Sequence, residues 1–340
     1  MPPPLTPAAR RRTFPIAGLT LAALVTLLGC LTPAAAQPEP EANPDPDPQA
    51  LATRLVLDAA AGDNPLLRMN ALEASQHLPQ QAEPLVRAGL DDPNPAVRWA
   101  ALITLGRLNL DALAPRASQL AQDPAQETYV RAAAAFAAHR TGHDADLGLI
   151  AQLLWDPRPG QRANAALLLS MLDEPSAIPM LRDAAQDPMT RSPKLKRELF
   201  RLQAAEALVQ LGDLESLKVV RGAVYSSEQE LRVLAIIILG RCADQGMTGN
   251  LIRLLAQDPV ELRLAAAAAL ASMGSNEGLP VMLEAAATST FSTVRAQAAN
   301  GLGQAADDPR ARQALASLLQ DPDAAVRLSA AAAWLAADHR

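Results

Sequence analysis

Apolar side chains recur along this chain at helical spacing, and the same pattern is repeated nine times. In nearly every copy an Arg has an apolar residue just before it, an Ala three residues later and an apolar residue seven residues later. These offsets lie on one face of a helix with 3.6 residues per turn, so that face is predicted to be core. A period of 30 to 39 residues is typical of stacked repeats and predicts one elongated body. The nine arginines are Arg68, Arg98, Arg131, Arg162, Arg201, Arg232, Arg263, Arg295 and Arg327.

A second segment with apolar periodicity precedes each Arg-containing segment, for example residues 250–257 and 311–320. In most copies the two segments are separated by an Asp-Pro pair, as at Asp92 and Pro93. Asp accepts hydrogen bonds from the free N–H groups at a helix start, and Pro suits the first helical position while ending the previous helix. Each copy is therefore predicted to be a pair of helices.

The residues from Asp321 to Ala331 read Asp, Pro, three residues, Val, Arg, two residues, Ala, Ala. This motif resembles the HEAT repeats of the phycobilisome-lyase-like family, and the resemblance covers about residues 50–340. It implies an all-α fold, a right-handed α-solenoid of about nine HEAT-type helical hairpins, with turn Asp and helix Arg residues forming ladders between neighbouring repeats. Ser226, Thr288 and an insertion between Asp187 and Arg201 depart from the pattern. The family implies an architecture rather than an activity, because such folds host many functions.

Residues 1–36 have the features of an export signal. Three arginines precede an apolar run that is too short for a transmembrane helix, which needs about 20 apolar residues. Two processing sites compete: cleavage before Cys30, which would then carry a lipid, or cleavage after Ala36. Either the general or the twin-arginine export route is compatible with these residues. Residues 37–49 alternate Pro with polar and acidic residues and are predicted to be a disordered linker.

Composition narrows the possible partners. The chain is 49% hydrophobic but only 3% aromatic, which suits helices stacked through Ala and Leu. Its formal net charge is -6, whereas general nucleic-acid binding requires a surplus of Lys and Arg on the contact face. We therefore expect no nucleic-acid partner. If Cys30 is removed or lipidated, Cys242 has no partner for a disulfide and is expected to be a buried, inert thiol.

Residues two, five and nine positions after each Arg share another face of the second helix and vary most between copies. The family resemblance implies that this helix lines the concave side of the solenoid. Large apolar residues flanked by arginines predict a partner-binding surface there. Alternatively, the apolar side chains pack against the next repeat. The residues concerned are Ile103, Arg107, Phe136, Arg140, Leu167, Met171, Leu234, Ile237 and Arg241.

The insertion in the fifth repeat is a second candidate surface. Arg191, Lys194, Lys196 and Arg197 concentrate positive charge around Pro193 in an otherwise acidic chain. Insertions in a solenoid lie at one edge, where binding loops often occur. This basic loop would suit anionic lipid headgroups or an acidic protein, and the alternative is a solvated helix extension.

Groups that could support catalysis are few. The chain has four histidines, of which His139 and His143 have metal-like spacing but flank a helix end at Gly142. It has no Gly-rich phosphate loop, nucleophile elbow or paired-Cys motif. We expect no catalytic residue, no metal and no cofactor.

These features favour a non-enzymatic protein-interaction scaffold in the cell envelope, exported to the periplasm or attached to the outer membrane as a lipoprotein through Cys30. The alternative location is a soluble, secreted form produced by cleavage at Ala36. Two alternatives stay open. The first is an enzyme accessory similar to a bilin lyase or a chaperone, and the second is a purely structural spacer.

Overall fold

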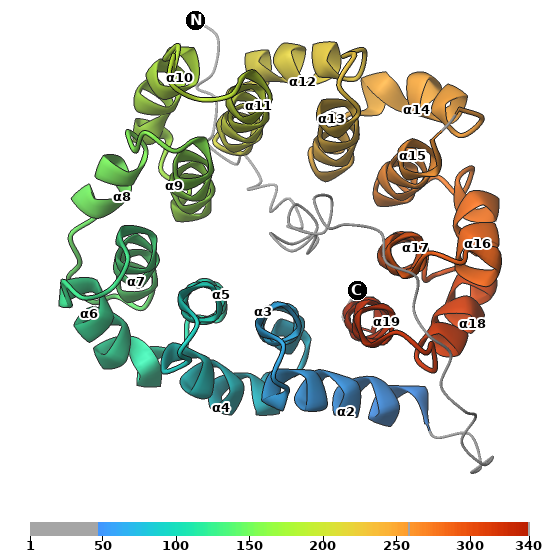
Figure 1. The fold of residues 1–340 in the computed structure, drawn as a ribbon, viewed down its shortest axis with the longest axis horizontal. Helices are drawn as coiled ribbons and strands as arrows, with labels where there is room; N and C mark the ends of the chain where they lie inside the picture. The colour runs from blue at the N-terminus through green and yellow to red at the C-terminus, as the bar shows by residue number, and fades with distance from the viewer. Residues whose placement is uncertain (1–46, 258, 339–340) are drawn as a thin grey trace, which may run out of the picture.

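A computed structural model describes residues 47–257 and 259–338. Within these residues the chain forms nine helical hairpins arranged as a closed ring (Figure 1). The first helix of each hairpin lies on the outside and the second lies on the inside. The outer helices are α2 (Pro48–Ala61), α4 (Pro79–Leu90), α6 (Ala114–Gln122), α8 (Gly148–Leu153), α10 (Ile178–Gln186), α12 (Leu217–Ala223), α14 (Thr248–Leu254), α16 (Leu279–Thr288) and α18 (Pro309–Leu318).

The inner helices carry the nine aligned arginines near their starts and pack side by side around the ring. They are α3 (Pro65–Ala74), α5 (Pro95–Leu108), α7 (Thr128–Arg140), α9 (Pro159–Leu172), α11 (Lys194–Gln210), α13 (Gln229–Arg241), α15 (Val260–Ser272), α17 (Ser292–Gln304) and α19 (Ala324–Ala337). Short 3₁₀ turns precede or follow some helices: η1 (Ser75–His77), η2 (Asp111–Leu113), η3 (Pro175–Ala177), η4 (Leu214–Ser216) and η5 (Gln245–Met247).

The predicted core face of the inner helices is confirmed. In α5, Val97, Ala101 and Leu105 occupy the three core offsets, and at most 1% of each residue is exposed. Ala at the middle offset lets the inner helix approach its outer partner closely, since Ala has the shortest apolar side chain. The all-helical solenoid of about nine hairpins predicted from the periodicity is therefore correct.

The turn between the helices of a repeat differs in one respect from the prediction. Asp92 does not cap α5; its carboxylate accepts a hydrogen bond from Asn94 N at 2.8 Å, and Asn94 is the residue that caps the helix. Pro95, rather than Pro93, holds the first helical position. The Asp at the start of the turn is thereby free to bind the preceding repeat.

That Asp forms the predicted ladder. Arg68 donates through Nη1 to the carbonyl oxygens of its own turn, Gly62 and Asp63, and through Nε to Asp92 of the next repeat at 2.7 Å. A single guanidinium thus ties two turns together. Comparable ion pairs, with N–O distances of 2.7 to 3.1 Å, join Arg98 to Glu127, Arg162 to Asp187 and Arg295 to Asp321. The ladder is partial: among the described residues, Arg131, Arg201 and Arg327 have no ion pair to another repeat and donate to carbonyl oxygens of their own repeat.

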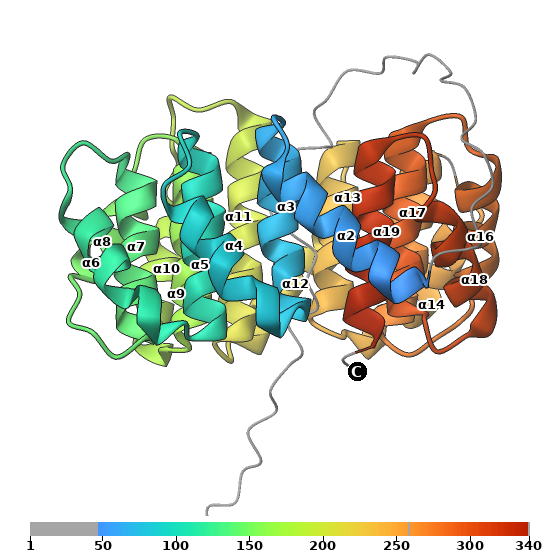
Figure 2. The same cartoon turned by 90° about the horizontal axis from the view of Figure 1, so that it is seen from below.

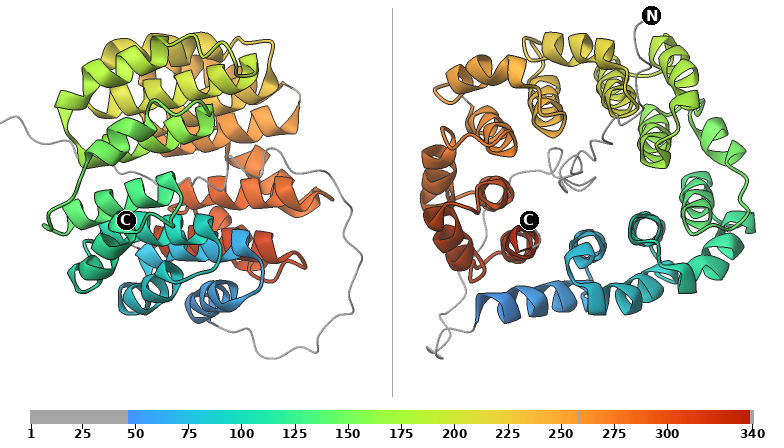
Figure 3. Two further views of the ribbon diagram at one scale, coloured as in Figure 1. Left: turned by 60° about the vertical axis from the view of Figure 1, so that its left-hand side comes forward. Right: turned by 180° about the vertical axis from the view of Figure 1, so that it is seen from behind.

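The two ends of the repeat array meet, so the expected elongated body is a ring instead. Helix α19 packs against both α2 and α3, which Figures 2 and 3 show from other sides. Val56 of α2 and Ala71 of α3 belong to the same buried cluster as Leu335 of α19. Across the junction, Trp334 donates from Nε1 to Gln49 Oε1 at 3.1 Å. Terminal repeats usually need a polar outer face, and here each apolar end covers the other.

The start of the ring lies two residues before the predicted boundary. Pro48 and Gln49, which are predicted to be linker, form the first turn of α2 because the Asp47 carboxylate accepts hydrogen bonds from the amides of Gln49 and Ala50. The predicted export signal and the rest of the linker, with Cys30, lie outside the described residues. Among the described helices, none is both long enough and apolar enough to cross a membrane.

Candidate functional site

The residues two, five and nine positions after each aligned Arg form a variable stripe along the inner helices. This stripe contains fewer accessible apolar side chains than predicted. Phe136 is fully buried, and Ile103 and Leu234 are only 5% and 2% exposed. The reason is close packing between inner helices. Phe136 of α7 lies against Gly106 of α5, where an added Cβ would be 2.4 Å from Phe136 Cε1. The expectation that these three residues form a surface is therefore corrected, and the alternative of packing against the neighbouring repeat holds for them.

Three other apolar residues of the stripe stay partly accessible: Leu167 and Met171 on α9, and Ile237 on α13. The amides Asn164 and Gln203 occupy stripe positions next to them and are also partly accessible. The stripe therefore offers a mixed polar and apolar surface around α9, rather than a continuous apolar one.

Two of the predicted rim arginines are paired within the ring. Arg107 lies 3.6 Å from Glu73, and Arg241 lies 3.1 Å from Glu206. In both pairs the paired Arg stands nine positions after the aligned Arg of its own repeat. The Glu stands five positions after the aligned Arg of the preceding repeat. Equivalent positions on neighbouring inner helices thus form a second, partial ladder.

Arg140 holds the same position in the third repeat but has no such partner, because the matching residue of the second repeat is Ile103. Its Nε donates weakly to Gly106 O at 3.4 Å. Within the described chain no carboxylate lies within ion-pair distance of this exposed guanidinium. Arg140 is the stripe arginine that is available to bind an anionic group.

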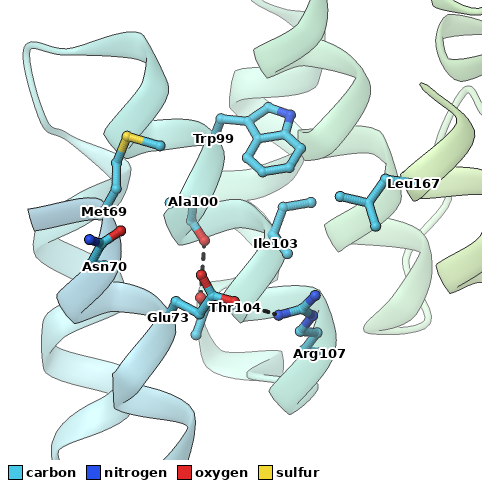
Figure 4. A pocket seen from close by; sticks show the side chains of 9 residues that line it. All are labelled: Met69, Asn70, Glu73, Trp99, Ala100, Ile103, Thr104, Arg107 and Leu167. Carbon is cyan, nitrogen blue, oxygen red and sulfur yellow. Dashed lines mark hydrogen bonds and ion pairs between the residues drawn. The ribbon is translucent and has the colours of Figure 1, made fainter. Parts of the chain in front are cut away.

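A small hollow lies on the inner face of the ring (Figure 4). It is lined only by inner helices, and Leu167 of α9 points toward Ile103 of α5 across it. Its volume is about 30 Å³, which is close to that of one water and far below the volume of a typical small-molecule pocket. The lining residues are Met69, Asn70, Glu73, Trp99, Ala100, Ile103, Thr104, Arg107 and Leu167.

Polar atoms in this hollow lack partners within the described chain. Asn70 Oδ1, Trp99 Nε1 and Arg107 Nε are all buried and make no hydrogen bond. A buried donor or acceptor without a partner costs about 1–3 kcal/mol, but these three atoms are closed to solvent and do not themselves face a bound group. The mainly apolar lining, with the Glu73–Arg107 pair beside it, fits the tip of an apolar side chain.

The basic loop lies elsewhere, at the junction of α10 and α11. Arg191 is in the turn, whereas Lys194, Lys196 and Arg197 form the first turn of α11, as the alternative of a helix extension predicts. Arg191, Lys194 and Lys196 are exposed, and Arg197 is partly buried. The turns that join outer to inner helices lie along one edge of the ring, the upper edge in Figure 2. The basic loop and the hollow are thus on different surfaces.

The remaining candidates for chemistry are limited. Burial, and next the negative charge of Glu206, raises the pKa of the Cys242 thiol to about 12, so the thiol is protonated and unreactive at neutral pH. His143 Nδ1 lies 3.0 Å from Thr141 O and 4.0 Å from Asp111 Oδ1. The described residues contain no group of three or more His, Cys, Asp or Glu side chains placed to hold a metal.

Sequence reasoning missed several residues of the hollow, notably Met69, Trp99 and Thr104. Trp99 directly follows a repeat Arg, and its role as a wall of the hollow has no signal in the sequence. The pairing of Glu73 with Arg107 does have a signal in the sequence, namely opposite charges at fixed offsets in adjacent repeats.

Comparison with known proteins agrees with the helical-repeat fold that the structure shows. A family model described as HEAT repeats matches residues 53–128, 118–192, 222–303 and 279–336, which is well over half of the chain. Searching curated proteins gave no match.

Solved structures with similar folds include the CpcE–CpcF complex of phycocyanin lyase from Nostoc sp. PCC7120, at 18% identity and a TM-score of 0.41, covering 68% of this chain and 91% of that chain. They also include human deoxyhypusine hydroxylase, at 17% identity and a TM-score of 0.36, covering 86% of this chain and 98% of that chain. At these identities the likeness concerns the fold alone.

Proposed function

Because this chain belongs to the HEAT repeat family, we propose that it is a non-enzymatic scaffold that binds a protein partner on the inner face of its ring. The observation that carries the proposal is the hollow between α3, α5 and α9, which is lined by apolar side chains and by the Glu73–Arg107 pair. Its volume of about 30 Å³ suits the tip of one side chain better than a metabolite.

The surroundings of the hollow extend this surface. Leu167 and Met171 supply accessible apolar contact area, and Arg140 supplies a guanidinium without a carboxylate partner. In protein interfaces, a few apolar or Arg side chains surrounded by a polar rim carry most of the binding energy. A segment with an apolar residue near an acidic one would match both features.

Affinity capture with the full chain as bait tests this proposal. Leu167→Glu and Arg140→Glu should each reduce recovery of a specific protein at least about tenfold, as expected for interface anchors. Val219→Glu is the matched control, because Val219 is 52% exposed on the outer helix α12. Far-ultraviolet circular dichroism would verify that all variants are folded. Equal recovery by the wild type and both inner-face variants would contradict the proposal.

The same variants test the spacer alternative, and an absorption spectrum tests the bilin-lyase alternative. A spacer would tolerate charge reversal anywhere on the inner face. A role like that of a bilin lyase would give the purified protein a visible absorption band, which a scaffold lacks.

We further propose that the scaffold works in the cell envelope. Support comes from residues 1–36 alone, through the arginines, the short apolar run and Cys30. Cys30→Ser followed by membrane fractionation tests attachment: the variant should move to the soluble fraction, while Cys242→Ser should fractionate like the wild type. Continued membrane association of Cys30→Ser would exclude a lipid anchor at that residue.

A further inference from the structure

The inserted basic loop is hydrogen-bonded to the turn that follows an exposed aromatic side chain of the preceding repeat. Trp155 ends the outer segment of the fourth repeat and is 47% exposed. Ser192 in the insertion donates from Oγ to the carbonyl oxygen of Pro157, two residues after Trp155, at 3.2 Å. Two elements about 35 residues apart along the chain thus form one surface.

The loop is held in this position rather than free. Arg162 Nη1 contacts Asp187 Oδ2 at 2.8 Å, at the loop's start. Met189 is 7% exposed, so it anchors the loop in the core, and its backbone has a φ of 39°, which is uncommon for a residue other than Gly. A loop fixed in this way binds with a smaller loss of entropy than a mobile one.

The Trp155 ring is also held by neighbouring side chains. The Arg162 guanidinium lies 5.8 Å from its centroid, and the same guanidinium lies 5.9 Å from the Phe200 ring. The indole is therefore oriented by its neighbours while nearly half of the residue stays open to solvent.

Charge at the start of α11 is unbalanced. Lys194, Lys196 and Arg197 occupy its first turn, which has no acidic residue and no side-chain cap. The helix N-terminus itself carries partial positive charge, so these cations repel both it and one another. An anion bound there would relieve this repulsion.

Nearby carboxylates do not neutralise the cations because they are already engaged. Asp156 pairs with Arg158 and Glu198 pairs with Arg201. Among the described residues, no carboxylate lies within ion-pair distance of Arg191, Lys194 or Lys196.

We propose that Trp155, Arg191, Lys194 and Lys196 form a basic rim patch that docks an acidic protein segment carrying an apolar residue for the indole. This surface is separate from the inner face, so the inference does not depend on the function proposed above. Trp and Arg are the residue types most often found at the energetic centre of protein interfaces.

The rest of the same edge favours a segment over a membrane. Other turns along it are acidic, with Asp63 between α2 and α3 and Glu228 between α12 and α13 both exposed. A flat anionic membrane would contact these acidic turns as well as the basic rim patch, and the acidic turns would repel it. A peptide would contact the basic rim patch alone.

A fluorescein-labelled peptide of alternating Glu and Leu is a direct probe, used with the full chain at low salt. Lys194→Glu combined with Lys196→Glu should weaken its binding about tenfold or more, and Trp155→Ala should weaken it independently. Lys218→Glu is the matched control, since Lys218 is an exposed lysine on the outer helix α12. A peptide with Gln in place of Glu should bind poorly.

Lysine acetylation read by mass spectrometry locates the peptide, because the chain has only three lysines: Lys194, Lys196 and Lys218. Bound peptide should protect the first two and leave Lys218 reactive. Equal binding of the Glu and Gln peptides, or unchanged binding by the double variant, would overturn the proposal. Protection of Lys194 and Lys196 by phosphatidylglycerol vesicles, without protection by the peptide, would also overturn it and assign the patch to a membrane.

Discussion

At the scale of single residues, glycines set how closely neighbouring inner helices approach. Gly106, Gly240 and Gly303 all stand eight positions after a repeat Arg. A Cβ at these sites would lie 2.4 to 2.8 Å from atoms of the next inner helix. The Phe136 ring can be buried because Gly106, which it contacts, has no side chain. The same packing removes Phe136 from the predicted binding surface.

Gly106→Ala should destabilise the protein by about 1–3 kcal/mol, because a fully buried Phe136 has no room to move away from the added methyl group. Gly222→Ala is the matched control: it is exposed in α12 with nothing within 4 Å of the added Cβ, and it should stabilise by about 0.5–1 kcal/mol. Urea midpoints would show both effects. A stabilising Gly106→Ala would contradict the close contact.

At the scale of helices and turns, the repeat is held to its neighbours by the Arg ladder. Arg68 and Asp92 have side chains only 16% and 10% exposed, so their pairing is sheltered from solvent. Burial alone would raise the pKa of Asp92, but hydrogen bonds from Arg68 and from the Asn94 amide lower it overall. The ladder therefore contributes to stability as well as to the register between repeats.

Asp92→Ala should cost about 2–3 kcal/mol, since it leaves the Arg68 guanidinium poorly solvated and without its anion. Asp58→Ala removes a carboxylate from a pair in which both side chains are more than 60% exposed, and it should cost less than about 0.5 kcal/mol. Guanidinium or urea unfolding followed by circular dichroism measures both changes. Equal midpoints for the two variants would show that the ladder adds nothing to stability.

At the scale of the whole molecule, closure is the feature that distinguishes this ring from an open solenoid. It depends on the junction of α19 with α2 and α3, where Trp334 contacts Gln49 and the Arg312 guanidinium lies 5.5 Å from the indole centroid. In a repeat protein each unit contacts mainly its neighbours, so the junction can open without unfolding the rest.

Trp334→Glu should open the ring, because it places a charge in the junction and removes the hydrogen bond to Gln49. The radius of gyration from small-angle X-ray scattering should rise while the helical circular dichroism signal is retained. Trp155→Glu replaces an exposed Trp away from the junction and should leave the radius unchanged. An unchanged radius in folded Trp334→Glu would mean that the other junction contacts suffice for closure.

Acid should weaken the whole ring. The pKa of Asp187 is lowered, first by the Met189 amide and then by Arg162, and the pKa of Asp213 is lowered, first by Arg182. Such groups bind fewer protons when folded, so their stabilisation is complete above about pH 4 and is lost as pH falls through the folded pKa. Denaturant midpoints should therefore drop steeply below about pH 4. Asp92→Asn should show a shallower drop, because it removes one of these groups.

The sequence by itself determined the nine hairpins and their register, since both follow from local periodicity and from turn residues repeated at fixed spacing, while the Arg ladder, which forms in part, was implied by the family resemblance. Closure, the burial of Phe136 and Leu234, and the attachment of the basic loop to the turn after Trp155 were decided only by the tertiary structure. Small rotations between neighbouring repeats add up along the array, and no local pattern encodes their sum. Helical periodicity also assigns a face only approximately, so it did not distinguish a side chain packed between two inner helices from one exposed beside them.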